Sequence, residues 1–415
     1  FGTKSYFPPK YREALFINEW AYGRIIAVHL TPTGASYSGE LEEFVRGRPL
    51  NVTDLTFGPD GHMYFITGGR KTQSGLYRVR YIGATVEGNA DATSNVQDEC
   101  RIARAQRREL EAFHGVVSDR AIATAWEQLD QIDPWLCNAA RVAIESQPTQ
   151  TWSEKALAEK RPTAGLTALL ALARVGDVAW KSRLLDRLAR FDFESLSAEQ
   201  RLMLVRAYQL CFVRMGPPDA KMSRQLAKRI LEHYPSDDTR RDRLSCELLV
   251  YLRSPDVIAK TLRLLEGDRS ETEKLHYLFC LRHLQNGWTM EQRKTLFHWL
   301  RKARGFKGAQ YVPRFVHYIE QDCLAHLSED ERQAVLPILQ MKVDEPAVHL
   351  TVDRDHVKDW KLIDFVFSLD KVGQGRDFEQ GKKMFSVARC SACHRMGEDG
   401  KAFGPDLTDV AKRFS

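Results

Sequence analysis

The chain has 415 residues, enough for about two to four domains, and 43% of them are hydrophobic, which is ample for several cores. Its 61 basic and 55 acidic residues are mixed along the chain and leave a net charge of +6, so the charge pattern gives no support for nucleic-acid binding. No apolar run approaches the length of about 18 residues that a membrane-spanning helix needs.

The first 83 residues have the apolar alternation and the turn residues that are typical of short β-strands. Residues 15–17 and 24–28 are β-rich runs, and residues 75–79 read as a further strand. Residues 54–57 and 63–66 flank a Gly-Pro-Asp-Gly turn, which is a strong hairpin signal. Short strands at this spacing predict blades of a β-propeller.

Residues 7–11, Phe-Pro-Pro-Lys-Tyr, and the step from Asp54 to Gly61 resemble the closing blades of six-bladed propellers of the sugar-dehydrogenase type. In quinone-dependent members of that family, arginines just before the Asp hold the carboxylates of pyrroloquinoline quinone. Positions 51–53 read Asn-Val-Thr here, so those arginines are missing and quinone binding is in doubt. The resemblance places the catalytic histidine in earlier blades, so we assign no catalytic residue.

From about residue 100 to 340, apolar residues recur at the i, i+3, i+4 and i+7 positions of amphipathic helices. Asp133 followed by Pro134 predicts a helix start, and a helix over residues 164–175 is expected to end at Gly176. Helices of about 10 to 15 residues, recurring at about 35 to 45 residues, predict an α-solenoid of HEAT type. Residues 126–141 also resemble HEAT-like segments of multidomain haem proteins.

No catalytic constellation stands out in this helical region. His276, His283 and His298 are expected to be surface residues or to have their hydrogen bonds satisfied, and not to be metal ligands. Six cysteines without metal-ligand spacing are predicted to act as small buried hydrophobes, with one or more disulfides as the alternative. They are Cys100, Cys137, Cys211, Cys246, Cys280 and Cys323.

Residues 341–375 are predicted to connect the helical region to a C-terminal domain. Pro346 breaks the helical pattern, residues 357–364 are expected to form a short docking helix, and Gly-Gln-Gly at 373–375 gives a hinge. An amphipathic helix is then predicted over residues 378–385.

The sequence Cys390-Ser-Ala-Cys393-His394 has the Cys-x-x-Cys-His spacing that attaches a c-type haem to a polypeptide. One helical turn would hold both thiols beneath the two vinyl groups, and the next residue would present its imidazole to the iron. A thioredoxin-like redox pair would follow a strand of a βαβ unit, and a zinc site would need two more nearby ligands. Neither context is present, so Cys390 and Cys393 are predicted to bind haem covalently, with His394 as the axial iron ligand.

Phe-Gly-Pro-Asp-Leu follows at residues 403–407, and with it residues 376–415 resemble a class I cytochrome c domain. In that family the Pro carbonyl accepts the N–H of the proximal histidine, so the resemblance implies that Pro405 orients His394.

The sixth iron ligand of such a domain is usually a Met on the far face of the porphyrin. Met396 is tethered to the proximal side by its place two residues after His394, and Met384 is expected to belong to the core. The axial Met is therefore expected in sequence beyond Ser415.

The chain is thus predicted to be multidomain: closing blades of a β-propeller (residues 1–83), HEAT-like repeats (100–340), a linker (341–375) and an all-α cytochrome c domain (376–415). This order resembles large secreted bacterial fusion proteins described as membrane-bound dehydrogenases or haem-binding domain proteins. The resemblance implies a periplasmic or otherwise extracytoplasmic oxidoreductase, because haem c is attached outside the cytoplasm. Its propeller would oxidise a small substrate such as a carbohydrate, and the haem would pass the electrons to a downstream acceptor.

The alternative interpretation is a non-catalytic binding scaffold in which the haem is an electron carrier or a sensor. The catalytic blades and any signal peptide are expected in sequence before Phe1, and a channel-facing histidine there would favour the dehydrogenase.

Overall fold

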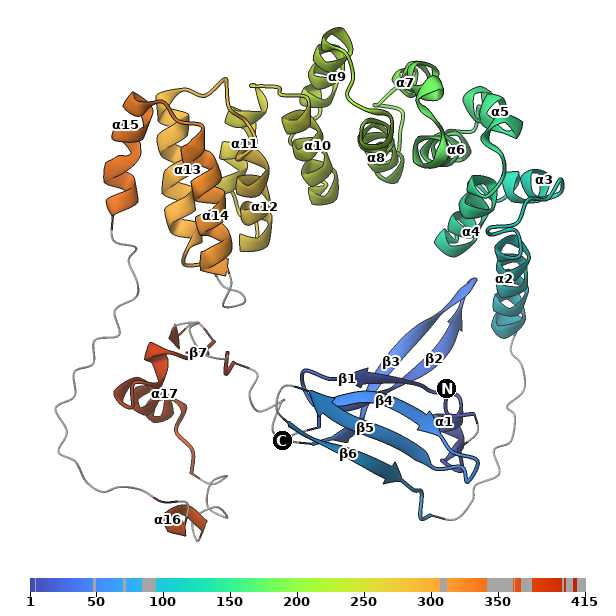
Figure 1. Cartoon of the computed structure of the whole chain (residues 1–415), viewed down its shortest axis with the longest axis vertical. Helices are drawn as coiled ribbons and strands as arrows, with labels where there is room; N and C mark the ends of the chain where they lie inside the picture. The colour runs from blue at the N-terminus through green and yellow to red at the C-terminus, as the bar shows by residue number, and fades with distance from the viewer. Residues whose placement is uncertain are drawn as a thin grey trace. The chain divides into compact units, whose positions relative to one another are not determined.

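The computed structural model describes residues 1–3, 5–47, 50–69, 72–83, 95–306, 312–341, 361, 363–366, 375–397, 399–400 and 406–408 (Figure 1). The chain divides into two compact units, Phe1–Pro217 and Pro218–Ser415. The first unit contains two three-stranded sheets and a run of helices, and the second contains further helices and the Cys-x-x-Cys-His segment.

The strands are β1 (Leu15–Glu19), β2 (Arg24–Thr33), β3 (Ser36–Arg46), β4 (Val52–Phe57), β5 (Met63–Gly69), β6 (Thr72–Val79), β7 (Arg395–Met396) and β8 (Asp399–Gly400). The helices of the first unit are α1 (Pro9–Arg12), α2 (Asn95–Glu111), α3 (Ala121–Trp126), α4 (Pro134–Glu145), α5 (Ser153–Ala158), α6 (Pro162–Val175), α7 (Lys181–Ala189) and α8 (Ala198–Met215). Those of the second unit are α9 (Ala220–Glu232), α10 (Thr239–Tyr251), α11 (Val257–Glu266), α12 (Glu271–Leu281), α13 (Met290–Ala303), α14 (Val312–Ala325), α15 (Glu329–Gln340), α16 (Ile363–Val366) and α17 (Phe378–Val387). Short 3-10 helices are η1 (Thr149–Thr151), η2 (Val178–Trp180) and η4 (Cys390–Ala392).

The N-terminal sheets are antiparallel and follow chain order, β1-β2-β3 and β4-β5-β6. The strand pairs predicted from the sequence are present; for example, Leu15 of β1 lies opposite Val28 of β2. Strand β3 has no counterpart among the predicted strands, because its exposed glutamates interrupt the apolar alternation that marks a half-buried strand. The described part of this region contains no closed barrel or propeller, only these two small sheets.

The two N-terminal sheets share one hydrophobic core. It contains Phe7, Ala14, Phe16, Ile25, Ala27, Leu50, Val52, Met63 and Phe65. The turn between β4 and β5 is closed by the N–H of Gly58, which donates to the carbonyl of His62 at 2.9 Å, and it places Gly61 at a φ of +68°. A glycine fits there because other residues rarely adopt a positive φ.

The helix boundaries follow the predicted capping signals. Asp133 caps α4, since its Oδ1 accepts hydrogen bonds from the backbone N–H groups of Trp135 and Leu136 at 2.8 and 3.2 Å. Helix α6 ends at Val175, and the N–H of the following Gly176 donates to the carbonyl of Leu172. Both boundaries confirm the prediction.

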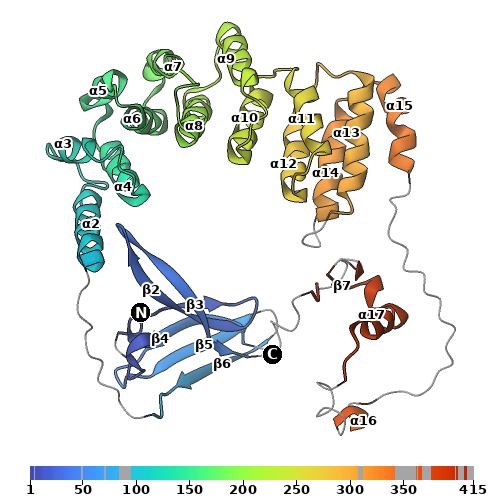
Figure 2. The ribbon, with the colours of Figure 1, turned by 180° about the vertical axis from the view of Figure 1, so that it is seen from behind.

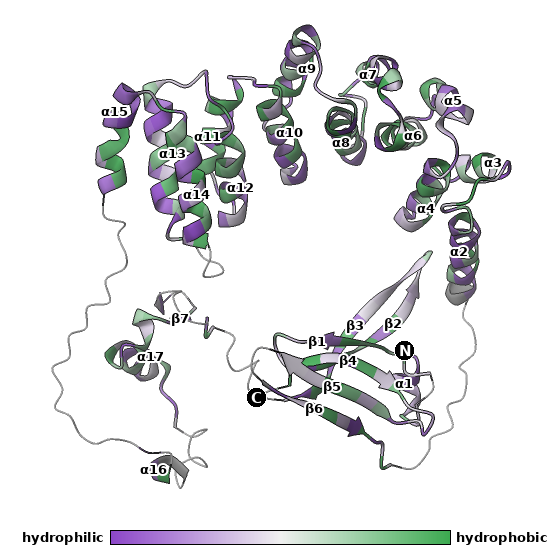
Figure 3. Cartoon of the chain, viewed as in Figure 1, coloured by the Kyte–Doolittle hydropathy of each residue, from purple (hydrophilic) through white to green (hydrophobic). Residues whose placement is uncertain are grey.

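The helices in each unit stack in layers (Figures 1 and 2). In the first unit, α4 packs against α2 and α6, and α6 packs against α8. In the second unit, α12 packs against α10 and α14, while α13 packs against α11 and α15. Each helix carries apolar residues on part of its surface and polar residues on the rest (Figure 3), so neighbours on both sides are needed to cover the apolar part.

No helix among the described residues is long and apolar enough to cross a membrane. Most of the predicted linker lies outside the described residues, and of the expected docking helix at 357–364 only Lys361, Ile363 and Asp364 are described, the last two within α16.

The hairpin of β2 and β3 contacts the first helices of its own unit through Asp133. The Oδ2 atom of Asp133 accepts a hydrogen bond from the backbone N–H of Ala35 at 2.6 Å, while its Oδ1 caps α4. The guanidinium of Arg107 on α2 donates to the carbonyl of Ala35 at 3.2 Å. Gly34 has a φ of +53°, and a Cβ added there would collide with Asp133. One carboxylate therefore joins the hairpin to the helices and starts α4.

We expect Asp133→Asn to destabilise the first unit by about 1–3 kcal/mol, because an amide can still cap α4 with its oxygen while its NH2 group cannot accept the N–H of Ala35. Asp133→Ala should cost about 0.5–2 kcal/mol more through loss of the cap. Urea denaturation followed by circular dichroism measures both. The matched control is Asp177→Asn, which alters a cap at η2 through the N–H of Ala179. Equal stability of Asp133→Asn and the unmutated chain would contradict the double role.

Candidate haem-binding site

The segment before the two cysteines is the amphipathic helix predicted from the sequence. Helix α17 begins at Phe378, where the side chain of Asp377 accepts a hydrogen bond from the N–H of Gln380 at 3.0 Å. The helix ends at Val387. Arg389, two residues later, has a left-handed φ of +58°. This left-handed residue turns the chain out of the helix and into η4.

The turn that carries the cysteines is closed by one carbonyl group. The carbonyl of Cys390 accepts the N–H of Cys393 at 3.2 Å and the N–H of His394 at 2.8 Å. In a 3-10 turn the side chains at i and i+3 eclipse each other, so the two thiols fall on the same side. Cys390 is half-buried, Cys393 is exposed, His394 is half-buried, and neither thiol is in a disulfide.

The residues after His394 fold back beside it. β7 and β8 form a small hairpin, and Gly400 in β8 has a φ of +90° with no room for a Cβ against the carbonyl of His394. The N–H of Leu407 donates to the carbonyl of Arg395 at 2.7 Å. The chain therefore returns next to the predicted iron ligand at Leu407. Pro405, two residues before Leu407, lies outside the described residues.

An ion pair links this hairpin to α17. The Nζ of Lys382 lies 2.8 Å from a carboxylate oxygen of Asp399, and this hydrogen bond raises the pKa of Lys382. Both side chains are exposed, so the pair contributes little to stability, but it joins the two elements that flank the cysteines.

The apolar side chains of α17 fit a large flat cofactor beside the thiols. None of the ten residues of this helix is buried: Met384, Phe385 and Val387 are half-buried, and Phe378 is 76% exposed. Met384 is only half-buried, so the expectation that it belongs to the protein core is wrong. An amphipathic helix whose apolar side chains lack a protein core has the surface that a porphyrin would cover.

The alternative chemistries find no support in the described residues. The cysteines follow a helix and precede a hairpin, whereas a thioredoxin-like pair follows a strand. Across the described ranges, no group of three or more His, Cys, Asp or Glu side chains could hold a metal ion, and this includes the surroundings of His276, His283 and His298.

The other thiols lie in the helical region, where the prediction of buried, small hydrophobes is confirmed for five of them. Cys137 is half-buried, and burial raises the pKa of its thiol. No described cysteine is in a disulfide.

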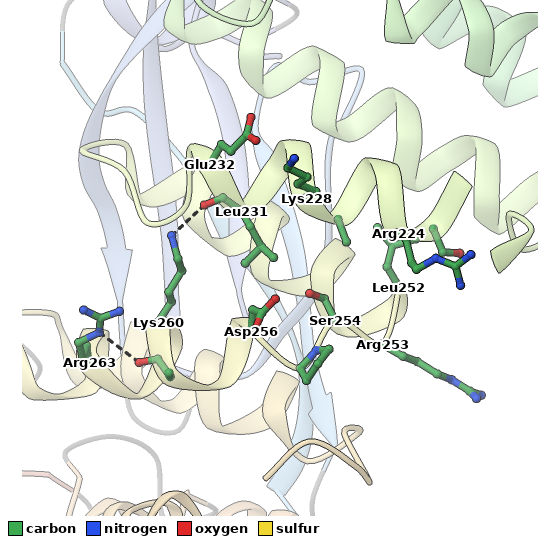
Figure 4. Close-up of a pocket in the computed structure, with 14 residues that line it drawn as sticks. Arg224, Lys228, Leu231, Glu232, Leu252, Arg253, Ser254, Asp256, Lys260 and Arg263 are labelled. Carbon is green, nitrogen blue, oxygen red and sulfur yellow. Dashed lines mark hydrogen bonds between the residues drawn. The ribbon is translucent and has the colours of Figure 1, made fainter. Parts of the chain in front are cut away.

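A cavity of about 680 Å³ lies between α9 and α11 in the second unit (Figure 4). Lys260 is already bonded there to the carbonyls of Leu231 and Tyr234, at 2.8 and 2.6 Å. Arg224 and Arg253 extend away from Lys260. These cations do not converge, so we assign the cavity no ligand.

The family model for cytochrome c matches residues 378–415. No curated protein matches the chain. The C-terminal segment therefore contains a cytochrome c domain, and that family implies covalently bound haem c with its iron. A haem of this kind serves in electron transfer with a redox partner.

We expect Gly400→Ala to lower the haem content of the chain, because the new Cβ would displace the carbonyl of His394 and open the turn. The matched control is Gly397→Ala: Gly397 also has a positive φ, +62°, but no atom of the described residues lies within 4 Å of the position of its Cβ. The control should show only the cost of about 1–2 kcal/mol for a left-handed alanine. The ratio of haem to protein, measured spectroscopically after purification, compares the two. Equal haem content in both variants would mean that the packing at Gly400 does not position His394.

Proposed function

We propose that this chain is an extracytoplasmic electron-transfer protein in which Cys390 and Cys393 bind haem c through thioether bonds and His394 ligates the iron. The observation that carries the proposal is the closed turn at Cys390, which gathers two thiols and an imidazole within five consecutive residues. When bound, the haem supplies a one-electron redox centre. The two cysteines would fix its position, and the imidazole of His394 would hold one face of the iron.

Pro405 would orient the imidazole of His394 through its carbonyl oxygen. Support comes from the residues that follow it: Leu407 is bonded to the backbone of Arg395, and the Oγ1 of Thr408 accepts the N–H of Gly397 at 2.8 Å. An acceptor for the second ring nitrogen sets the tautomer and raises the basicity of the ligating nitrogen.

The two N-terminal sheets are, in this proposal, closing blades of a propeller of the sugar-dehydrogenase type, over residues 1–83. Both are antiparallel meanders, and they share one core. Ile66 and Leu76 are 45% and 72% exposed, and with Trp20 they line a hollow on the second sheet. Exposed apolar side chains gathered in this way favour the packing of a further sheet against them.

The helical region, over residues 100–340, would be a HEAT-type solenoid that connects the propeller to the cytochrome c domain through the linker at 341–375. The packing of each helix against the next helix but one supports the solenoid, because each repeat of a solenoid contacts only its neighbours.

The propeller would oxidise a small substrate such as a carbohydrate, and the haem would take up the electrons and pass them to a downstream acceptor. Fusion in one chain keeps donor and haem at high effective concentration. We do not propose pyrroloquinoline quinone as cofactor: positions 51–53 hold no arginine, and the side chain of Asn51 donates to the carbonyl of Trp20 at 2.9 Å. The periplasm is the proposed location, because haem c is attached outside the cytoplasm.

We expect Cys390→Ala and Cys393→Ala each to leave one thioether bond, and the double variant to leave none. After expression with cytochrome c maturation proteins, a denaturing gel stained for haem peroxidase activity should show haem on both single variants and none on the double variant. His394→Ala should keep the haem on the gel but change the visible spectrum of the iron, because it removes an axial ligand and no thioether. Cys323→Ala is the control, since its buried thiol lies on α14. An unmutated chain without covalent haem would refute the proposal.

The dehydrogenase and the scaffold interpretations predict different responses of the haem to added substrate. If the propeller oxidises a carbohydrate, an anaerobic mixture of the haem-loaded full-length protein with a panel of aldoses should reduce the haem, and the visible spectrum records it. If no aldose reduces a haem that dithionite does reduce, the scaffold interpretation is favoured.

A further inference from the structure

One residue beside the cysteine turn has a backbone conformation that is unfavourable for its type. Arg389 follows the end of α17 by two residues and has a φ of +58°. Glycine is the usual residue at this place after a helix, because the left-handed region is unfavourable for residues with a Cβ. An arginine stays in that region only where its surroundings hold it there, and such conformations are concentrated at functional sites.

Backbone hydrogen bonds hold Arg389 on both sides. Its N–H donates to the carbonyl of Ser386 in α17 at 3.0 Å, and its own carbonyl accepts the N–H of Ala392 in η4 at 3.0 Å. Within the described ranges its exposed guanidinium makes no ion pair or hydrogen bond, so the side chain does not account for the conformation. The backbone of Arg389 therefore belongs to the end of the helix and to the start of the turn that carries the cysteines.

The left-handed backbone folds the first cysteine back over the end of α17. The Sγ of Cys390 lies 3.9 Å from the carbonyl oxygen of Ala388, the residue before Arg389. The carbonyl of Cys390 then accepts the N–H of Cys393 and closes the turn. An extended backbone at Arg389 would direct both cysteines away from the helix. The conformation of this one residue thus sets where the two thiols lie relative to the half-buried apolar side chains of α17.

We propose that Arg389 is a positioning residue for haem attachment: its left-handed backbone places the thiols of Cys390 and Cys393 beside the apolar face of α17. The inference rests on the covalent haem c of the proposed function. In each attachment the S–H of a cysteine adds across a vinyl C=C bond. The sulfur bonds to one carbon and the hydrogen to the other, so no oxidant or reductant takes part. Because each thiol must lie against its own vinyl group, the direction of the turn decides whether both bonds form.

The helical region offers a matched arginine that has no cysteine beside it. Arg253 has a φ of +54°, follows the end of α10 by two residues, and donates its N–H to the carbonyl of Val250 at 2.9 Å. Like Arg389 it is exposed. Residue type, backbone conformation and place after a helix are therefore the same at both positions. A substitution at Arg253 measures the general cost of disturbing a left-handed arginine, without a change next to the cysteine turn.

Substitutions at Arg389 in the full chain, expressed with cytochrome c maturation proteins, test the proposal. Arg389→Gly and Arg389→Asn keep access to the left-handed region, so we expect two thioether bonds, as in the unmutated chain. Valine resists that region, so Arg389→Val should lose doubly attached haem and leave one cysteine free. Alkylation of free thiols and peptide mapping count the thioethers. The pyridine haemochrome band should also move to longer wavelength, because one vinyl group remains. Arg253→Val should lower the melting temperature but change neither readout.

A second readout needs no haem. Dibromobimane fluoresces strongly once it has joined two thiols, and in the haem-free chain it should crosslink Cys390 to Cys393 more slowly in Arg389→Val than in Arg389→Gly. The double variant Cys390→Ala/Cys393→Ala gives the background from the other cysteines. An unmutated chain without covalent haem would refute the proposed function, whereas slower crosslinking in Arg389→Val would still support the role of Arg389.

Two results would overturn the inference about Arg389. The first is a lost thioether in Arg389→Gly, which counts even if Arg389→Val fails to fold, because it would mean that the guanidinium and not the backbone matters. The second is an equal loss of thioethers in Arg253→Val and Arg389→Val, because the loss would then come from general destabilisation.

Discussion

The arrangement of this chain depends on apolar helix faces that no helix can cover alone. In the helical region each face is covered by the adjacent helix and by the next but one, so α6 depends on both α4 and α8, and α12 on both α10 and α14. Helix α17 has the same amphipathic pattern but no buried residue. Its apolar side chains lie beside the two cysteines, and haem c is the partner that would cover them. The apolar faces that hold the layers of helices together thus have a counterpart in α17, where haem c would take the place of a neighbouring helix.

Single polar groups fix how the elements meet. The carboxylate of Asp133 caps α4 with one oxygen and binds the β2–β3 hairpin with the other, so one side chain sets both the helix start and the position of the hairpin. The carbonyl of Cys390 has a similar double role, because it accepts the N–H groups of Cys393 and His394. In each case a carboxylate or carbonyl group that already accepts one hydrogen bond accepts a second from a neighbouring segment, and the direction of a hydrogen bond makes the orientation of that segment specific.

Local signals in the sequence predicted much of the fold. Asp133, Pro134 and Gly176 predicted helix ends correctly, because capping depends on a few adjacent residues. Capping boxes at Ser197, Ser270, Thr289 and Ser328 mark four further helix starts that the same reasoning could have located. Strand β3 escaped prediction because its acidic side chains face solvent and leave no apolar alternation.

The sequence by itself determined the chemistry of the C-terminal segment. Two thiols and an imidazole within five residues specify haem c through covalent spacing alone, and the family match bears out the cofactor. The tertiary structure decided what depends on residues far apart in the chain: that the two sheets share one core, that Met384 is only half-buried, and that Asp133 joins the β2–β3 hairpin to α4. Sequence periodicity shows which face of a helix is apolar, but only packing decides which element covers that face, because many partners present the same apolar pattern.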